Sequence, residues 1–324
     1  MELTNVLAYD IGGSHATAGI VDYGSLAVIC VRSRPIDSSG PANSILDELH
    51  ALGEGVIAEA RQLGVTTRGI GVAMPGPFDY EHGISLLQHK YASLYRMDLR
   101  RELGNRFGIA ESTIVFLNDA QAFLLGECHA GAAKNLRRCI GLTLGTGVGS
   151  AFSMDGDIVE NGPAVPPGGE IYCLPWTGGT VEDTISTRAI QKRYRELSGE
   201  SRTVKEICMA AQHDCNAALA MREFGGSLGL VVQDLCMAFR PDAIVLGGEI
   251  SRSADLFVLS AAASAGNGTG DLFRVSELFN DAPLVGAAVR CLKLCGVQAL
   301  GALDRNDAGD LPEQSKNSDT VKEG

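Results

Sequence analysis

Apolar positions in this chain follow two alternating spacings, one typical of strands and one typical of helices, with glycine-rich turns at the junctions. In the first 35 residues, three short apolar runs over 6–9, 16–22 and 27–34 are separated by glycine turns, which predicts an antiparallel meander. Apolar residues then recur at helical spacing over 43–63, and a buried strand follows at 68–74. Strands that alternate with helices in this way predict an α/β protein.

The rest of the chain continues the alternation and becomes mainly helical after residue 182. Further apolar strands are expected at 113–118, 140–144 and 241–248. Further helices are expected over 94–107, 120–132, 184–197, 216–240 and 284–303. Residues 304–324 are polar without an apolar period, so we expect a disordered tail there.

Two of the glycine-rich turns directly follow an apolar strand, a position typical of anion-binding turns. The first contains Gly12 and Gly13, with Asp10 at the end of the strand. The second contains Gly145 and Gly147. Glycine lets backbone N–H groups approach an anion without obstruction by a Cβ atom. Either turn taken alone is equally explained by an ordinary β-hairpin.

A carboxylate stands at the junction between the strand ending at Asn118 and the helix that follows. Asp119 has two interpretations here: an N-cap for the helix, or a rigidly held general base at the mouth of a cleft. The two roles are compatible, because a capped side chain is held in one orientation.

Composition and charge narrow the classes of protein. The 324 residues are 45% hydrophobic and carry a formal net charge of −12, which predicts a soluble globular chain long enough for two lobes. A negative surface argues against nucleic acid or an anionic membrane as partner. We see no secretory signal or bilayer-length apolar run, so a cytoplasmic location is expected. Nine cysteines without C-x-x-C spacing are interpreted as free thiols.

Several motifs occur in a fixed order, and together they make the chain recognisable. They are Asp10–Ser14, Gly71–Asp79, Leu117–Ala122 with Gly126-Glu127, Thr143–Gly149, Gly168–Glu170 and Ile244–Glu249. From about residue 5 to residue 302, the chain resembles the ROK family of sugar kinases, within the actin/hexokinase/Hsp70 ATPase superfamily.

The resemblance implies a two-lobed, actin-like (ribonuclease H-like) α/β fold with ATP and sugar in the cleft between the lobes. The first lobe would cover 1–117 and the second 118–283, and the helix over 284–303 would pack back on the first. A homodimer is usual in the family, so we expect one here.

The resemblance also assigns roles to single residues. ATP would be bound by Asp10, Gly12, Gly13 and Ser14, by Gly145, Thr146 and Gly147, and by Gly247 and Gly248. Asp10 would hold the hydrated Mg²⁺ of ATP, and Asp119 would be the general base. Contacts to the sugar would come from Gly76, Asn118, Asp119, Glu170 and Glu182.

The chain departs from the family pattern in three places. Tyr172-Cys173 stands where the family has Gly-His, and the zinc-binding cysteine cluster that usually follows is absent, so we expect no zinc site. His15 stands where lysine is common. The segment around His89 and Lys90 also differs; these side chains are either solvated or in contact with sugar or phosphate.

We therefore expect an ATP- and Mg²⁺-dependent hexose kinase that phosphorylates the primary hydroxyl, with glucose as the leading substrate. Mannose, fructose, allose or an N-acetylated hexosamine are alternative substrates, and inorganic polyphosphate is an alternative donor. A sensor that binds sugar without catalysis is a second alternative. A repressor is disfavoured, because those relatives carry an N-terminal helix-turn-helix and the first phosphate turn here begins at residue 10.

Overall fold

The computed structural model describes residues 5–266 and 268–306, and of residues 296–306 only the backbone. The first half of the chain is built on a five-stranded sheet of order β3-β2-β1-β4-β7. The predicted meander forms one side of it, with β1 (Asn5–Ile11), β2 (His15–Val21) and β3 (Val28–Pro35) antiparallel. β4 (Thr67–Met74) and β7 (Ile114–Asn118) continue the sheet parallel to β1, so β1, β4 and β7 all end at the same edge.

Two helices cover the outer face of this sheet. They are α1 (Ala42–Gln62) and α2 (Leu99–Phe107), and α1 buries Ile45, Leu46 and Leu49 against β1 and β2. The helix expected over 94–107 begins five residues later than predicted. The Asp98 carboxylate caps α2 by accepting a 3.0 Å bond from the N–H of Arg101, and 92–94 form a separate 3₁₀ turn.

A second five-stranded sheet of order β10-β9-β8-β13-β14 repeats this plan. An antiparallel hairpin of β8 (Arg138–Leu144) and β9 (Val148–Met154) lies beside the parallel strands β13 (Ala243–Gly247) and β14 (Phe273–Val275). The short strand β10 (Asp157–Ile158) completes the edge. The two glycine turns, β1–β2 and β8–β9, therefore occupy equivalent positions in the two sheets.

The helices on the outer face of the second sheet are α4 (Val181–Thr184), α5 (Thr187–Ser198), α6 (Val204–Ala210), α7 (Cys215–Phe239) and α8 (Val258–Ala265). The helix expected over 184–197 is α5, which begins three residues later and ends one residue later than predicted. The short α4 precedes it, and Ile185, which is buried with φ −126° and ψ 41°, separates the two. Gly225 and Gly229 of α7 allow its backbone to approach Phe257 and α8 closely.

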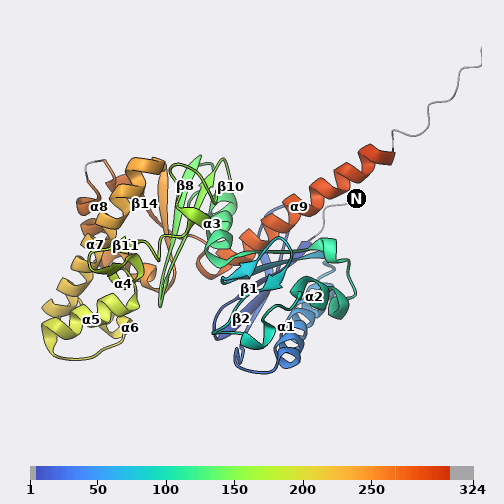
Figure 1. Ribbon diagram of the computed structural model, residues 1–324, viewed down its shortest axis with the longest axis horizontal. Coiled ribbons are helices and arrows are strands. Elements are labelled where there is room, and N and C mark those ends of the chain that lie inside the picture. The colour runs from blue at the N-terminus through green and yellow to red at the C-terminus, as the bar shows by residue number, and fades with distance from the viewer. Residues whose placement is uncertain (1–4, 267, 307–324) are drawn as a thin grey trace, which may run out of the picture.

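α3 (Asp119–Ala130) and the first part of α9 (Ala282–Asn306) lie side by side between the two sheets, and α9 then runs outward past the first sheet (Figure 1). α9 packs on β1 and β4 of the first sheet, and α3 packs on β8 and β9 of the second. The helices touch through Gly286, where a Cβ atom would collide with the Ala122 carbonyl. α9 continues three residues into the expected disordered tail, and the rest of that tail, 307–324, lies outside the described residues.

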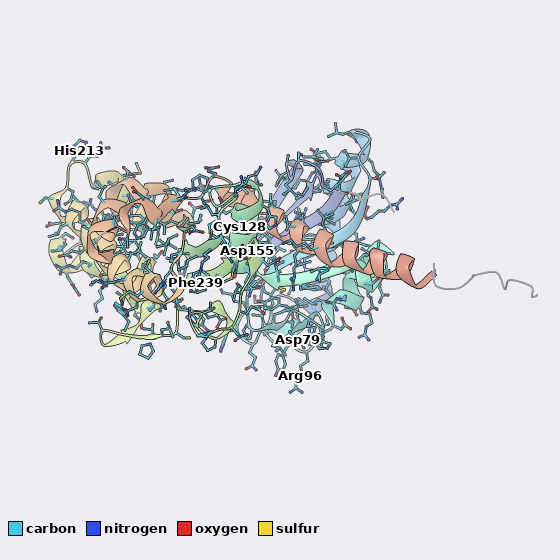
Figure 2. All side chains as sticks on the ribbon, turned by 90° about the horizontal axis from the view of Figure 1, so that it is seen from above. Asp79, Arg96, Cys128, Asp155, His213 and Phe239 are labelled. Carbon is cyan, nitrogen blue, oxygen red and sulfur yellow. The ribbon has the colours of Figure 1, made fainter. Side chains whose placement is uncertain are left out.

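The longest excursion from the first sheet connects β4 to α2 and contains β5 (Phe78–Asp79), β6 (Ile84–Ser85) and a 3₁₀ turn over Ala92–Leu94. Figure 2 shows Asp79 and Arg96 together at the margin of the molecule that this excursion forms. Backbone bonds between Ser85 and both Arg96 and Met97 close it into a loop. Among the helices that the structure describes, none is both long enough and apolar enough to cross a bilayer.

Candidate functional site

Asp10 lies at the end of β1, where the chain enters the first glycine turn. The turn is closed by a 2.9 Å bond from the N–H of Gly12 to the carbonyl of His15. Burial, and secondarily the nearby charge of Asp119, raise the pKa of Asp10 to about 7. A cation bound beside Asp10 would favour the ionised form of its carboxyl group. The end of β1 is therefore suited to hold a cation.

Asn118 and Asp119 stand at the junction of β7 and α3, and their local roles differ from the prediction. Asn118, not Asp119, is the N-cap: its side-chain oxygen accepts bonds from the N–H groups of Ala120 (2.9 Å) and Gln121 (3.3 Å). Asparagine is as good a cap as aspartate, and here it precedes the first helical residue. Asp119 is that first residue, with Oδ1 2.8 Å from the N–H of Ala120.

The surroundings of these two side chains hold them in place. The Asn118 amide donates to the Tyr80 hydroxyl at 3.3 Å, and that hydroxyl donates to the carbonyl of Met74 at 3.0 Å. Gly76, expected at the sugar, lies beside the same hydroxyl. Burial raises the pKa of Asp119, while its bond to Ala120 and the charge of Lys90 act in the opposite direction.

A cavity of about 260 Å³ lies between the two sheets and brings together the ends of three strands. Asp10 from β1, Asp119 after β7 and Gly248 after β13 all line it. The structure thus places two carboxylates and one predicted nucleotide-binding glycine in a single space. Its remaining lining residues are Thr17, Phe123, Thr143, Arg252, Phe279, Asn280 and Pro283.

The second glycine turn carries an unexpected carboxylate. Glu182, which the sequence resemblance assigns to the sugar, accepts a 3.2 Å bond from the N–H of Val148 through Oε2. Its other oxygen accepts from the Arg188 guanidinium at 2.9 Å. The carboxylate lies against Gly147, and the N–H of Thr187 bonds to the carbonyl of Gly145 at 2.8 Å. The start of α5 is therefore docked onto the turn.

Glu170 lies in the segment that follows β9. The Ser150 hydroxyl fixes this segment by donating to the carbonyl of Gly169 at 2.6 Å and accepting from the N–H of Ile171 at 3.0 Å. Burial and then the charge of Asp119 raise the pKa of Glu170, so the two carboxylates interact electrostatically. Contact of Glu170 with a sugar stays a prediction.

A larger cavity of about 500 Å³ adjoins the loop after β13. It is lined mainly by the start of α5, by α6 and by the 3₁₀ segment Glu249–Leu256. Gly247 and Gly248 precede that segment, and Gly248 has a φ of 80° with no room for a Cβ beside Leu144. Arg252 lines both this cavity and the smaller one.

Arg252 is a candidate that the sequence analysis missed. Its guanidinium donates to the Asn280 side chain at 3.1 Å and lies 4.6 Å from the centre of the Phe279 ring. The sequence gives no sign of the contact between Arg252 and Asn280, because these residues are 28 positions apart and only the fold brings them together. The one local signal is that Arg252 closely follows Gly247-Gly248.

The segment around His89 and Lys90, one of the three that depart from the family pattern, lies against the first glycine turn. The Tyr91 hydroxyl donates to the carbonyl of Gly12 at 2.6 Å. A Cβ atom placed on Gly13 would lie 2.5 Å from Lys90 Nζ. Next to them, Ser14 Oγ and His15 Nδ1 are 3.1 Å apart.

The side chains that remain after the zinc motif is lost form no metal cage. Cys173 is exposed and unpaired by disulfide. Within 5–266 and 268–295, no group of three or more histidine, cysteine or acidic side chains is placed to hold a metal ion. Trp176 packs against the core of the second half from the short strand β11 (Pro175–Trp176).

Comparison with known proteins agrees with this arrangement. The model of the ROK family matches residues 6–293. A glucokinase from Thermotoga maritima is 26% identical over 319 residues, covering 89% of this chain and 97% of the relative. The DNA-binding transcriptional repressor Mlc from Escherichia coli is 25% identical over 58% of this chain and 50% of the repressor.

Among solved structures, a ROK family glucokinase from Streptomyces griseus in complex with glucose and AMPPNP has the same fold, with a TM-score of 0.71 at 22% identity. The match covers 88% of this chain and 98% of the glucokinase. The two-lobed, actin-like fold expected from the sequence is confirmed. The chain belongs to the ROK family.

Proposed function

We propose that this sugar kinase transfers the γ-phosphoryl group of ATP to the primary hydroxyl of a hexose, with glucose as the first candidate. The observation that carries the proposal is the cavity that Asp10, Asp119 and Gly248 share at the ends of three strands. It offers a carboxylate for the attacking hydroxyl, a carboxylate for a cation and an adjoining space for a nucleoside. The similarity to proteins named glucokinase supports glucose as the first sugar to test.

The donor fits across the two cavities. The larger cavity would take the nucleoside, and the phosphate chain would pass Gly248 and Arg252 into the smaller one. Arg252 lines both spaces, so its guanidinium is placed where a planar, always-charged group can pair with phosphate oxygens. The glycine turns add backbone N–H donors, as Val148 already does for the Glu182 carboxylate.

Mg²⁺ fits the residues at the end of β1. The pKa of Asp10 is raised by burial and by Asp119, so a nearby cation would relieve an unfavourable arrangement of acidic groups. A single protein carboxylate suits an ion that keeps several waters and binds phosphate oxygens. When bound, Mg²⁺ neutralises charge on the phosphates of the donor.

Asp119 supplies the base. The first turn of α3 fixes its backbone, and Oδ1 accepts from the N–H of Ala120, so the carboxylate points from a rigid element. It would accept the proton of the sugar hydroxyl as the hydroxyl oxygen attacks the γ-phosphorus. Because such transition states are loose, placement of the two reactants contributes most of the acceleration, and the base adds about 10²–10⁴-fold.

The sugar would lie between Asp119 and Glu170, within reach of the Asn118 amide. Asn118 offers its N–H₂ group, because its oxygen is used as the helix cap. Glu182 can join the sugar only by leaving Val148 and Arg188.

The proposal is tested by a coupled ADP-release assay with ATP and Mg²⁺ against glucose, mannose, fructose, allose, N-acetylglucosamine and N-acetylmannosamine. We expect turnover on at least one hexose, retained after zinc chelation. Inorganic polyphosphate replaces ATP in a parallel series that measures the sugar phosphate formed, because transfer from this donor releases no ADP. Hexose binding by calorimetry with no transfer from either donor would contradict the proposal and indicate a sugar sensor.

A further inference from the structure

The loop that contains Lys90 is fixed to the first glycine turn by its neighbour Tyr91. The Tyr91 side chain is fully buried, and its hydroxyl donates to the carbonyl of Gly12 at 2.6 Å. The N–H of Tyr91 bonds to the carbonyl of Ser38 at 2.8 Å, and the Ser93 hydroxyl bonds to the carbonyl of Gly40 at 2.7 Å. Residue 90 therefore has a defined place beside Gly12 and Gly13, although the loop departs from regular secondary structure.

The Lys90 ammonium lies along the backbone of Gly13 and faces the region of the proposed base. A Cβ on Gly13 would be 2.5 Å from Nζ and 3.0 Å from Cε, so the ammonium group lies directly against this glycine. Burial raises the pKa of Asp119, and the charge of Lys90 opposes this rise, so the Asp119 carboxylate lies within the field of the ammonium group. Lys90 is exposed and makes no ion pair with any carboxylate whose side chain the structure describes.

The charges around this position create a need for such a cation. Asp119 raises the pKa values of both Asp10 and Glu170, so three acidic groups interact across the site. The phosphate chain of ATP would be repelled by these acidic groups, in a protein whose net charge is already −12. The negative charge of the transferring group is greatest on its equatorial oxygens, where a cation stabilises it most.

We propose that Lys90 is a catalytic residue that contacts the γ-phosphoryl group of the donor between the first glycine turn and Asp119. The inference rests on the proposed kinase function and adds a residue for the terminal phosphate. Lysine acts here as a compact point charge that follows the group during transfer. Arg252, by contrast, lies by the nucleoside cavity and Gly248, where the inner phosphates would pass.

The test compares binding of two nucleotides that differ in the terminal phosphate. Lys90→Met keeps an unbranched side chain, shorter by one heavy atom, and removes the charge. We expect it to weaken binding of AMPPNP with Mg²⁺ at least about tenfold, while ADP and sugar affinities stay within about twofold. Lys90→Arg should restore part of the AMPPNP affinity. Lys134→Met, at an exposed lysine on the loop after α3, controls for loss of one positive charge and should bind as the wild type does.

The same variants also give a kinetic readout. Lys90→Met should lower kcat with ATP by about 10- to 100-fold. Equal losses of ADP and AMPPNP affinity, unchanged AMPPNP affinity, or a large loss of sugar affinity would each overturn the role of Lys90. The nucleotide comparison measures binding and needs no turnover. The role of Lys90 can therefore be disproved even if the wild type phosphorylates a hexose. It can also be supported even if the acceptor is not a hexose. Unchanged melting temperatures confirm that the variants fold.

Discussion

The two glycine turns hold equivalent places in their sheets, yet side chains of opposite charge lie on them. On the first turn, Lys90 lies against Gly13 and Tyr91 holds the carbonyl of Gly12. On the second, the Glu182 carboxylate accepts from the N–H of Val148. A carboxylate bound to this backbone shows that the second turn attracts anions even in a protein of net charge −12.

The difference suggests a division of labour between the two turns. The first turn is ready for the terminal phosphate, because a cation already lies beside it. Under the proposed function, phosphate would reach the N–H of Val148 at the second turn only after the Glu182 carboxylate moves away from it. The following predictions test this asymmetry, and the largest effect is expected at the carboxylate that lies between the turns.

Asp119→Asn removes the proposed base and keeps the shape of the side chain. We expect kcat to fall at least about 100-fold with little change in sugar affinity, because the amide cannot take the hydroxyl proton. Steady-state kinetics and calorimetric titration of the sugar measure the two quantities. Near-wild-type turnover in this variant would show that Asp119 is not the general base.

Glu182→Gln tests the carboxylate on the second turn. The neutral amide competes less well for the N–H of Val148 and releases Arg188, so we expect the KM for ATP to fall about two- to fivefold. ADP release without sugar should rise for the same reason. Glu196→Gln, an exposed residue of α5 that pairs with Arg193 away from the turn, is the charge-matched control.

The opposite kinetic pattern would support the interpretation drawn from the sequence resemblance. If the KM for the hexose rises and the KM for ATP stays constant, Glu182 is a sugar ligand in the working enzyme. Its contact with Val148 would then have no influence on donor binding.

Asp10 is expected to affect the stability of the ligand-free protein as well as its activity. Its pKa is about 7 in the folded protein, well above the ordinary value near 4, so the folded state binds the proton more tightly than the unfolded state. The free energy of unfolding of the ligand-free protein should therefore fall as pH rises from about 4 to 7. Asp10→Asn should retain only the part of this fall that comes from other groups, including Asp119.

Urea unfolding of both proteins at pH 5 and pH 8 measures this difference. An equal loss of stability in wild type and variant would show that Asp10 ionises normally. The environment at the end of β1 would then not require a cation.

Local patterns predicted much of the fold, because they depend on neighbouring residues. Apolar alternation located β1, β2 and β8, and the strand-to-helix junction at Asn118-Asp119 was placed correctly. The identity of the N-cap was wrong, since Asn and Asp cap equally well and only the backbone conformation decides between them. The one-turn helix α4 was not predicted, because four residues are too few to show an apolar period.

The site was harder to predict wherever a contact joins distant segments. Lys90 reaches Gly13 across 77 positions of sequence, and Arg252 meets Asn280 across 28. Glycine and acidic motifs marked where an anion or cation could bind. The charged side chains that complement them come from other segments, and only the folded chain brings them into range.

The central claim is that the cleft between the turns directs a phosphoryl group to the primary hydroxyl of a hexose. Proton-coupled phosphorus NMR of the product formed from ATP, Mg²⁺ and the preferred hexose tests it most directly. A phosphate ester on a primary hydroxyl neighbours two hydrogens, so the account predicts a triplet, and no such signal when Asp119→Asn replaces the wild type in the same incubation. A doublet from a secondary ester, or the same rate of product formation with Asp119→Asn, would contradict the account.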